Sequence, residues 1–148
     1  MYKNILIATD GSDLADKAIQ HGLSLAKEHK SKTIIVTATE IWSASDIATR
    51  TESGEYDAIQ RFEEFQASRA KKILTEAESK ANGVGVACET IHLRDRHPAE
   101  GIIETANSNN VDLIVMASHG RRGIKRMLLG SVANEVVSRA SVPVLICR

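Results

Sequence analysis

Short apolar runs alternate along the chain with longer segments in which apolar residues recur every three or four positions. The runs at residues 4–8, 33–38, 111–116 and 142–147 are continuous and rich in branched side chains, and residues 86–93 alternate between apolar and polar. Continuous runs of this length are typical of strands buried on both faces of a parallel sheet, and alternation is typical of a half-buried strand. The pattern therefore predicts a sheet of five strands.

Helical spacing connects these strands. Apolar residues recur every three or four positions after Ser12, over residues 57–82, after Pro98 and from about Ser131. Ser12 is a suitable N-cap and Pro98 suits the first turn of a helix, so both residues mark helix starts. Strands that alternate with helices predict an α/β fold, in which a parallel sheet carries helices on both faces. Alternation alone leaves the strand order open.

Residues 40–56 have no hydrophobic periodicity, and acids outnumber bases from Glu40 to Glu64. We expect an irregular, solvated surface segment here, because exposed connections are polar and tolerate variation. A lid over a ligand cleft is the alternative interpretation.

Composition narrows the class of protein. The 148 residues are 43% hydrophobic and 26% charged, with a formal net charge of zero. A general nucleic-acid binder would carry a basic excess, and a membrane span would need a long apolar stretch that is missing here. Cys88 and Cys147 lie in apolar strands without a metal or redox spacing, so we expect inert buried thiols and a cytoplasmic protein.

A glycine-rich segment follows the fourth predicted strand. Gly120 permits a bend after that strand, while Gly130 and Ser131 stand where the last helix begins. A helix N-terminus offers unpaired N–H groups and partial positive charge, so it attracts anions such as phosphate. The chain lacks the G-x-x-x-x-G-K-[ST] pattern of P-loop enzymes. Asp10 closes the first strand, where ligands of parallel sheets also bind.

The segments "ILIATDGSDLADKAI" and "VDLIVMASHGRRGIKRMLLGSVANEVVSRASVPVLICR" resemble the two ends of a universal stress protein. The resemblance covers the whole chain and implies a single domain over residues 1–148. It implies a flavodoxin-like, Rossmann-like three-layer sandwich with strand order 3-2-1-4-5. It also implies a homodimer, which we expect to form through the apolar last strand because that strand would lie at a sheet edge.

Nucleotide-binding members of this family carry the motif G-x2-G-x9-G-[ST]. In this chain the motif positions are Ala117, Gly120, Gly130 and Ser131, so alanine replaces the first glycine. If the family glycine provides space, the methyl group lowers affinity; if it provides a positive φ, binding is lost.

The resemblance implies ATP as the ligand, with Mg²⁺ or Mn²⁺ carried by its phosphates. The phosphates would contact Gly120, Gly130, Ser131 and Val132, the ribose would contact Asp10, and the adenine would contact the backbone at Ala8 and Ala38. Arg96 stands where family members often have a glycine, and it either crowds the cleft or reaches a phosphate.

The family function implied is a nucleotide-binding regulatory or stress-response module, and any ATPase activity is expected to be slow because no carboxylate or base for water is evident. A nucleotide-free dimeric interaction scaffold is the alternative. The loop carries four cations that either attract the triphosphate or are simply exposed, solvated charges without a binding role: Arg121, Arg122, Lys125 and Arg126. The sequence specifies no protein client.

Two other chemistries are disfavoured. Asp10, His119 and Ser131 have the residue types of a hydrolytic triad, but the G-x-S-x-G elbow of such enzymes is missing. The segment "HLRDRH" offers His92, Asp95 and His97 as metal ligands, but a polar segment that follows a strand usually lies on the protein surface without binding a metal.

Overall fold

The computed structural model of the chain describes residues 1–39, 42–121 and 129–148. The strands are β1 (Asn4–Ala8), β2 (Lys32–Ala38), β3 (Cys88–Leu93), β4 (Leu113–Ala117) and β5 (Val144–Cys147), and the helices are α1 (Asp13–His29), α2 (Ala44–Glu52), α3 (Tyr56–Gly83), α4 (Pro98–Ser108) and α5 (Ser131–Arg139). The strands form one parallel sheet of order β3-β2-β1-β4-β5. The expected α/β fold and the strand order 3-2-1-4-5 are confirmed.

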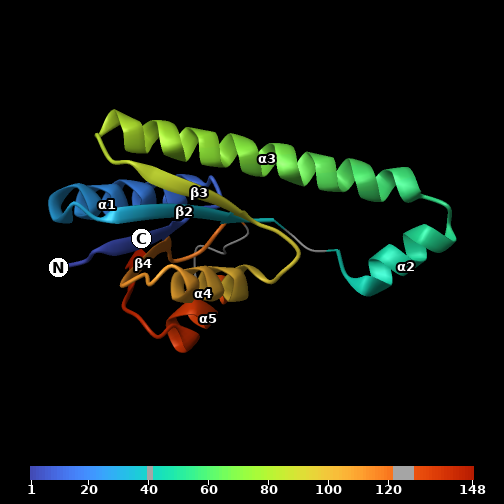
Figure 1. Cartoon of the computed structure of the whole chain (residues 1–148). Helices are drawn as coiled ribbons and strands as arrows, with labels where there is room; N and C mark the ends of the chain where they lie inside the picture. The colour runs from blue at the N-terminus through green and yellow to red at the C-terminus, as the bar shows by residue number, and fades with distance from the viewer. Residues whose placement is uncertain (40–41, 122–128) are drawn as a thin grey trace.

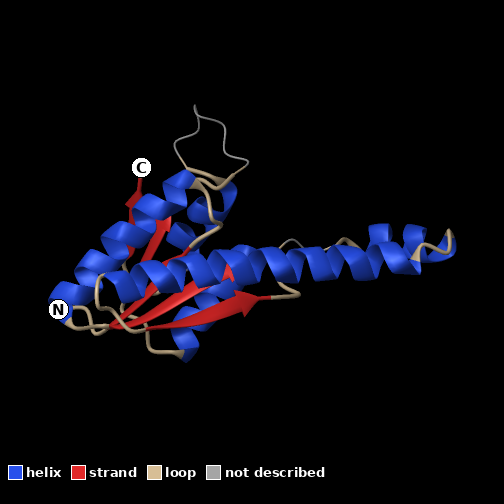
Figure 2. Ribbon diagram, turned by 90° about the horizontal axis from the view of Figure 1, so that it is seen from above, coloured by secondary structure: helices blue, strands red, loops and turns tan. Residues whose placement is uncertain are grey.

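Helices cover both faces of the sheet, giving three layers (Figures 1 and 2). On one face, Ile5 and Ile7 of β1 pack with side chains of α1 and α3. On the other face, Leu6 packs with side chains of α4 and α5. β1, β2 and β4 are buried on both faces, which is why their sequences are continuous apolar runs, whereas the alternating β3 is only partly buried. None of the helices in the described residues has both the length and the apolar character that crossing a membrane requires.

Local signals fix the start and the packing of α1. The Ser12 side chain accepts a hydrogen bond from the Ala15 N–H at 3.2 Å, as expected for an N-cap. Gly22 allows α1 to lie close to β1, since a Cβ there would come within 2.6 Å of Ile7 Cδ1. The N-cap fixes where α1 begins, and the glycine keeps α1 close to β1. The short turn between these two elements carries Asp10.

The expected solvated surface segment at residues 40–56 is confirmed for the described residues 42–56, but the expectation that it is irregular is wrong. Residues 44–52 form α2, and α3 begins at Tyr56, close to the predicted start of the long helix. Ser43 caps α2 by accepting a hydrogen bond from the Asp46 N–H at 3.1 Å. No residue of α2 is buried, so hydrophobic periodicity carried no signal for this helix. Residues 40–41 lie outside the described part of the chain.

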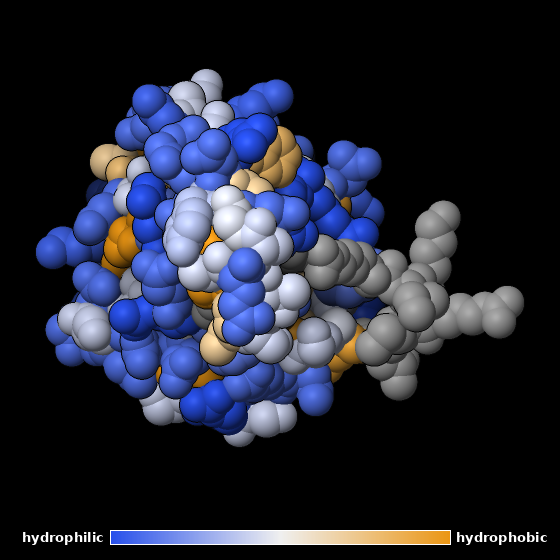
Figure 3. Space-filling model, turned by 90° about the vertical axis from the view of Figure 1, so that its right-hand side faces the viewer, coloured by the Kyte–Doolittle hydropathy of each residue, from blue (hydrophilic) through white to orange (hydrophobic). Residues whose placement is uncertain are grey.

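The arm, which we define as residues 42–64, projects beyond the end of the sheet (Figure 1). It is held by an edge-to-face contact between Trp42 and Phe62 at 4.8 Å and by Arg50, whose guanidinium lies 4.5 Å from the centre of the Trp42 ring. Seen end on, the surface around the arm is mostly hydrophilic (Figure 3). Contacts of this kind contribute about 1 kcal/mol each, so the arm adds little to the stability of the sheet and its core.

We predict that replacing residues 43–54 by a short glycine-serine linker leaves the fold intact. The segment contributes no buried side chain from α2, and Trp42 already lies beside Phe62, so the cut ends are close to α3. The variant should show a single cooperative transition by far-UV circular dichroism, with a melting temperature within a few degrees of the parent. Loss of cooperativity would show that the arm is part of the core structure.

Candidate functional site

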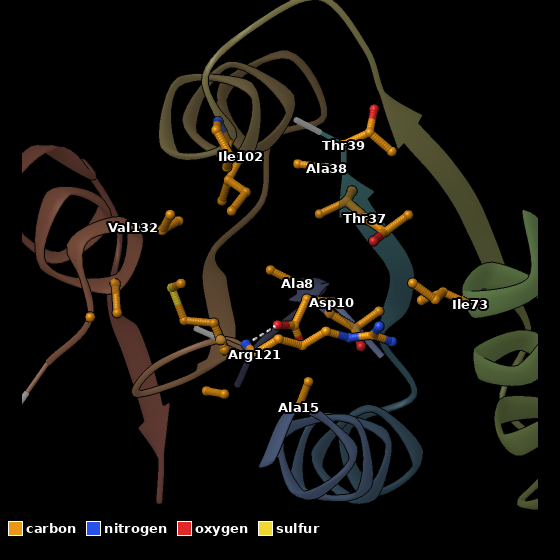
Figure 4. Close-up of a pocket in the computed structure, with 18 of the residues that line it drawn as sticks. Ala8, Asp10, Ala15, Thr37, Ala38, Thr39, Ile73, Ile102, Arg121 and Val132 are labelled. Atoms are coloured by element: carbon orange, nitrogen blue, oxygen red, sulfur yellow. Dashed lines mark hydrogen bonds between the residues drawn. The ribbon is translucent and has the colours of Figure 1, made fainter. Parts of the chain in front are cut away.

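A cavity of about 550 Å³ lies at the edge where the carboxyl ends of β1, β2 and β4 meet the start of α5. Figure 4 shows side chains from α1, α3, α4 and α5 surrounding it. Its size is in the range of pockets for small ligands and cofactors. All the binding residues expected from the sequence line this cavity: Ala8, Asp10, Ala38, Ala117, Gly120, Gly130, Ser131 and Val132.

The Asp10 carboxylate connects two loops that are far apart in sequence. Its Oδ1 accepts a hydrogen bond from the Ser12 N–H at 3.0 Å, and its Oδ2 accepts one from the Arg121 N–H at 2.7 Å (Figure 4). An ionised carboxylate has about four acceptor positions, so two backbone bonds leave room for further donors. Asp10 is thus held in a fixed orientation and can still accept hydrogen bonds from hydroxyl groups.

Gly120 is required because the Asp10 carboxylate lies directly against it. A Cβ at position 120 would come within 2.7 Å of Asp10 Oδ2. The expected reason was conformational freedom at a bend, but Gly120 does not adopt a positive φ. Close approach, rather than backbone conformation, explains this glycine.

The N-terminus of α5 opens into the cavity. Gly130 is its N-cap residue, with φ −70° and ψ 165°, and no side chain of the described residues caps the helix. The first helical bond runs from the Asn134 N–H to the Gly130 carbonyl at 2.9 Å, so the N–H groups of residues 131–133 have no helical partner. Ser131, Val132 and Ala133 all line the cavity. These groups form a site suited to an anion.

Gly130 is also held close to the loop after β4. Its N–H donates to the Ser118 carbonyl at 2.7 Å. A Cβ at position 130 would come within 3.1 Å of His119 Cα. A larger residue would therefore push α5 away from the loop and from the cavity.

Ala117 occupies the first glycine position of the motif with ordinary strand geometry. It is the last residue of β4, is paired with Cys147 of β5, and is 8% exposed. It is not among the residues with positive φ, so an L side chain fits its backbone. The backbone at this position does not need a positive φ. The structure therefore supports the interpretation in which the family glycine provides space and the methyl group of Ala117 lowers affinity.

Arg96 neither crowds the cavity nor faces it. Its guanidinium forms an ion pair with Glu104 of α4, and Arg96 is not among the residues that line the cavity. Of the expected cations, Arg121 lines the cavity and its Nη2 donates to the Gly11 carbonyl at 3.5 Å. Arg122, Lys125 and Arg126 lie outside the described residues.

The disfavoured chemistries gain no support. The His119 ring nitrogen Nδ1 bonds to Ser118 Oγ at 3.1 Å, and no hydrogen bond between described residues joins it to Asp10 or Ser131. His92 Nδ1 accepts from Arg94 Nε at 3.0 Å, which leaves Nε2 to donate to Thr39 Oγ1 at 3.0 Å. Burial, followed by the positive charge of Arg94, lowers the pKa of His92, so the ring is a neutral hydrogen-bonding group.

The two thiols differ in exposure. Cys147 is buried as expected, whereas Cys88 is only half-buried. Burial raises the pKa of both thiols, and Glu78 adds to the effect at Cys88. Both remain protonated and weakly nucleophilic near neutral pH.

Sequence reasoning missed most of the cavity wall contributed by α3 and α4. The residues of α3 that line the cavity recur at helical spacing. Pro98 and Ile102 of α4 line the same cavity. Threonines next to the predicted strand ends were also missed. The additional wall residues include Thr9, Thr37, Thr39, Gln66, Arg69, Ala70, Ile73, Pro98, Ile102, Met116 and His119.

Comparison with known proteins gives a consistent result. The model of the universal stress protein family matches residues 1–148. The universal stress protein YxiE of Bacillus subtilis is 34% identical over 152 residues, covering 100% of both chains. The solved structure of MJ0577, a universal stress protein of Methanocaldococcus jannaschii, has a TM-score of 0.76 at 28% identity and covers 99% of this chain and 96% of its own. The crystal structure of a universal stress protein in complex with cAMP has a TM-score of 0.69 at 28% identity, covering 99% and 97%.

We predict that Gly120→Ala destabilises the protein by about 1–3 kcal/mol, because the new methyl group forces the Asp10 carboxylate or the loop to move. In the Asp10→Ala background the same substitution should cost almost nothing, since the group it collides with is gone. Urea unfolding of the four proteins measures this coupling. An equal loss of stability in both backgrounds would contradict the close contact between Gly120 and Asp10.

Proposed function

The chain belongs to the universal stress protein family, and we propose that it binds an adenine nucleotide, ATP, in the cavity at the carboxyl edge of its sheet. The observation that carries the proposal is that one cavity of about 550 Å³ contains both the Asp10 carboxylate and the open N-terminus of α5. A carboxylate suits the hydroxyl groups of a ribose, and a helix N-terminus suits phosphate.

The sheet order suggests how the nucleotide lies. β4, β1 and β2 are successive neighbours, so their ends form a row along the cavity. We assign the phosphates to Gly120, Gly130, Ser131 and Val132, beside β4 and α5. The ribose then lies at Asp10 after β1, and the adenine lies near Ala8 and Ala38, toward β2.

A related protein supports a nucleotide as the ligand. A universal stress protein 28% identical to this chain forms a crystallised complex with cAMP. ATP in this chain would extend its phosphates along the N-terminus of α5. No group of three or more metal-binding side chains is found within the described ranges, so Mg²⁺ or Mn²⁺ would be held by the phosphates themselves, as Mg²⁺ commonly is.

We further propose that the protein is a cytoplasmic regulatory or stress-response module rather than a fast enzyme. Asp10 is the one carboxylate among the cavity-lining residues in the described part of the chain, and it bonds to two backbone N–H groups. A rapid ATPase needs a group that positions and activates water. Any hydrolysis should therefore be slow.

The proposal predicts that ATP stabilises the protein. At a hundredfold excess over its Kd, a ligand adds about 2.7 kcal/mol to the free energy of unfolding, which is visible as a shift in melting temperature. Gly130→Val should abolish the shift because its side chain collides with the loop at His119. Ala117→Gly should enlarge it by removing the methyl group. Gly83→Val is the matched control, since a Cβ at Gly83 meets nothing within 4 Å.

Isothermal titration calorimetry at millimolar ATP distinguishes the outcomes. Binding to Ala117→Gly but not to the natural chain would mean that Ala117 closes the site. Absence of binding to both proteins would contradict the proposal and favour the nucleotide-free scaffold.

We also propose a homodimer formed through β5. This strand is at the edge of the sheet and pairs only with β4. The carbonyls of Pro143 and Cys147 accept hydrogen bonds from the N–H groups of Ile114 in β4 and Ser118 just after it, at 3.0 and 2.9 Å. Because backbone direction alternates along a strand, Val144 and Ile146 present their N–H and C=O groups outward. An apolar edge of this kind favours pairing with another chain.

Light scattering at micromolar concentration should therefore give twice the 16.1 kDa mass of the chain. Ile146→Pro removes an outward N–H group but leaves the β4 side of the ladder in place, so it should shift the mass toward the monomer. Ile146→Ala keeps that N–H group and should remain dimeric. A monomeric natural chain would contradict the interface.

A further inference from the structure

Gln66 occupies a buried position in an otherwise apolar stripe of α3. The buried residues of this helix recur at three- or four-residue spacing and face the sheet: Gln66, Ala70, Leu74, Ala77 and Ala81. Gln66 is 8% exposed, whereas glutamine is mostly exposed in proteins. A polar residue at this point of the stripe therefore requires a physical explanation.

The Gln66 amide has no hydrogen-bond partner among the residues that the structure describes, although its side chain lines the cavity. No fully buried side-chain nitrogen or oxygen atom in that part of the chain lacks a partner. The amide atoms must therefore still be in contact with the open cavity. Burying an amide without a partner costs about 1–3 kcal/mol, so a ligand that covers this amide in the cavity must hydrogen-bond to it to avoid that cost.

Gln66 also borders a second space, whose walls contain none of the residues assigned to the phosphates. It lines this second hollow of about 190 Å³ together with Thr39, Trp42 and Phe62 of the arm and its base. Thr39 and Gln66 belong to the walls of both spaces. Thr39 directly follows Ala38 at the end of β2, which is separated from β4 and the start of α5 by β1.

We propose that Gln66 reads the base of the bound nucleotide, with its side-chain amide hydrogen-bonded to the polar edge of that base. This inference rests on the proposed nucleotide site and assigns the group that recognises its base. Thr39 Oγ1 accepts a hydrogen bond from His92 at 3.0 Å, and its O–H group can still donate a single bond to the base. An amide supplies both a donor and an acceptor, which matches the paired donor and acceptor atoms on the edge of a purine.

The test compares two ligands that differ only in the base, ATP and ribose 5′-triphosphate, by calorimetry. Gln66→Met keeps the length of the side chain but removes its hydrogen-bonding groups. It should lower the affinity for ATP roughly three- to tenfold. It should leave ribose 5′-triphosphate unchanged. Gln60→Met, the same change at an exposed position of α3, is the control and should alter neither affinity. The ligand-free Gln66→Met protein should melt close to the parent temperature, since the amide makes no hydrogen bond to the described residues and is in contact with the open cavity.

A second variant tests base reading directly. Gln66→Glu has nearly the same shape but loses the N–H donor, so the ratio of ATP affinity to GTP affinity should change at least threefold, while Gln60→Glu leaves this ratio unchanged. The inference is overturned if Gln66→Met weakens both ligands equally, or weakens neither while the parent binds ATP. If the parent binds neither ligand at millimolar concentration, the proposed function fails and the inference fails with it. If the parent binds ribose 5′-triphosphate as tightly as ATP, the nucleotide site stands and base reading by Gln66 is wrong.

Discussion

The site depends on one interaction, the bridge that the Asp10 carboxylate makes between the loops after β1 and β4. It accepts hydrogen bonds from the N–H groups of Ser12 and Arg121, which belong to opposite ends of the sequence. Gly120 has no side chain because the carboxylate lies against it. Gly130 then brings the N-terminus of α5 to the same place by bonding to Ser118. An anion site and a hydroxyl-binding group are thereby positioned before any ligand binds, which lowers the entropic cost of binding.

The order of the strands extends the binding site on both sides of Asp10. With β4, β1 and β2 side by side, the start of α5, Asp10 and the end of β2 follow one another along the cavity. A nucleotide has the same sequence of chemical parts, from phosphate through sugar to base. The wall formed by α3 completes the row with two polar side chains, Gln66 and Arg69, and Gln66 shares both hollows with Thr39.

Much of this arrangement could be predicted from the sequence, because burial determines which residues are apolar. Strands buried on both faces must be apolar throughout, so residues such as Ile5 and Ile114 marked their strands, and every ligand residue inferred from the family motif lines the cavity. The strand order came from the family resemblance, since alternation of elements is compatible with several orders. α2 was missed because it buries nothing, although Ser43 and Asp46 form a capping pair that could have indicated it. Gln66 was missed because a polar residue interrupts the apolar pattern that defines the buried face of α3.

The central claim is that the carboxyl edge of the sheet binds a nucleotide with its phosphates at α5 and its base at the end of β2. Titration of the ¹⁵N-labelled protein with ATP, followed through its backbone amide NMR signals, tests this most directly. We expect shifts concentrated at the amides of Gly120, Gly130 and Ser131 and at Thr39, which lines the cavity as Gln66 does, with Gly83 at the far end of α3 unaffected. No shift at millimolar ATP, or shifts concentrated away from the cavity, would contradict it.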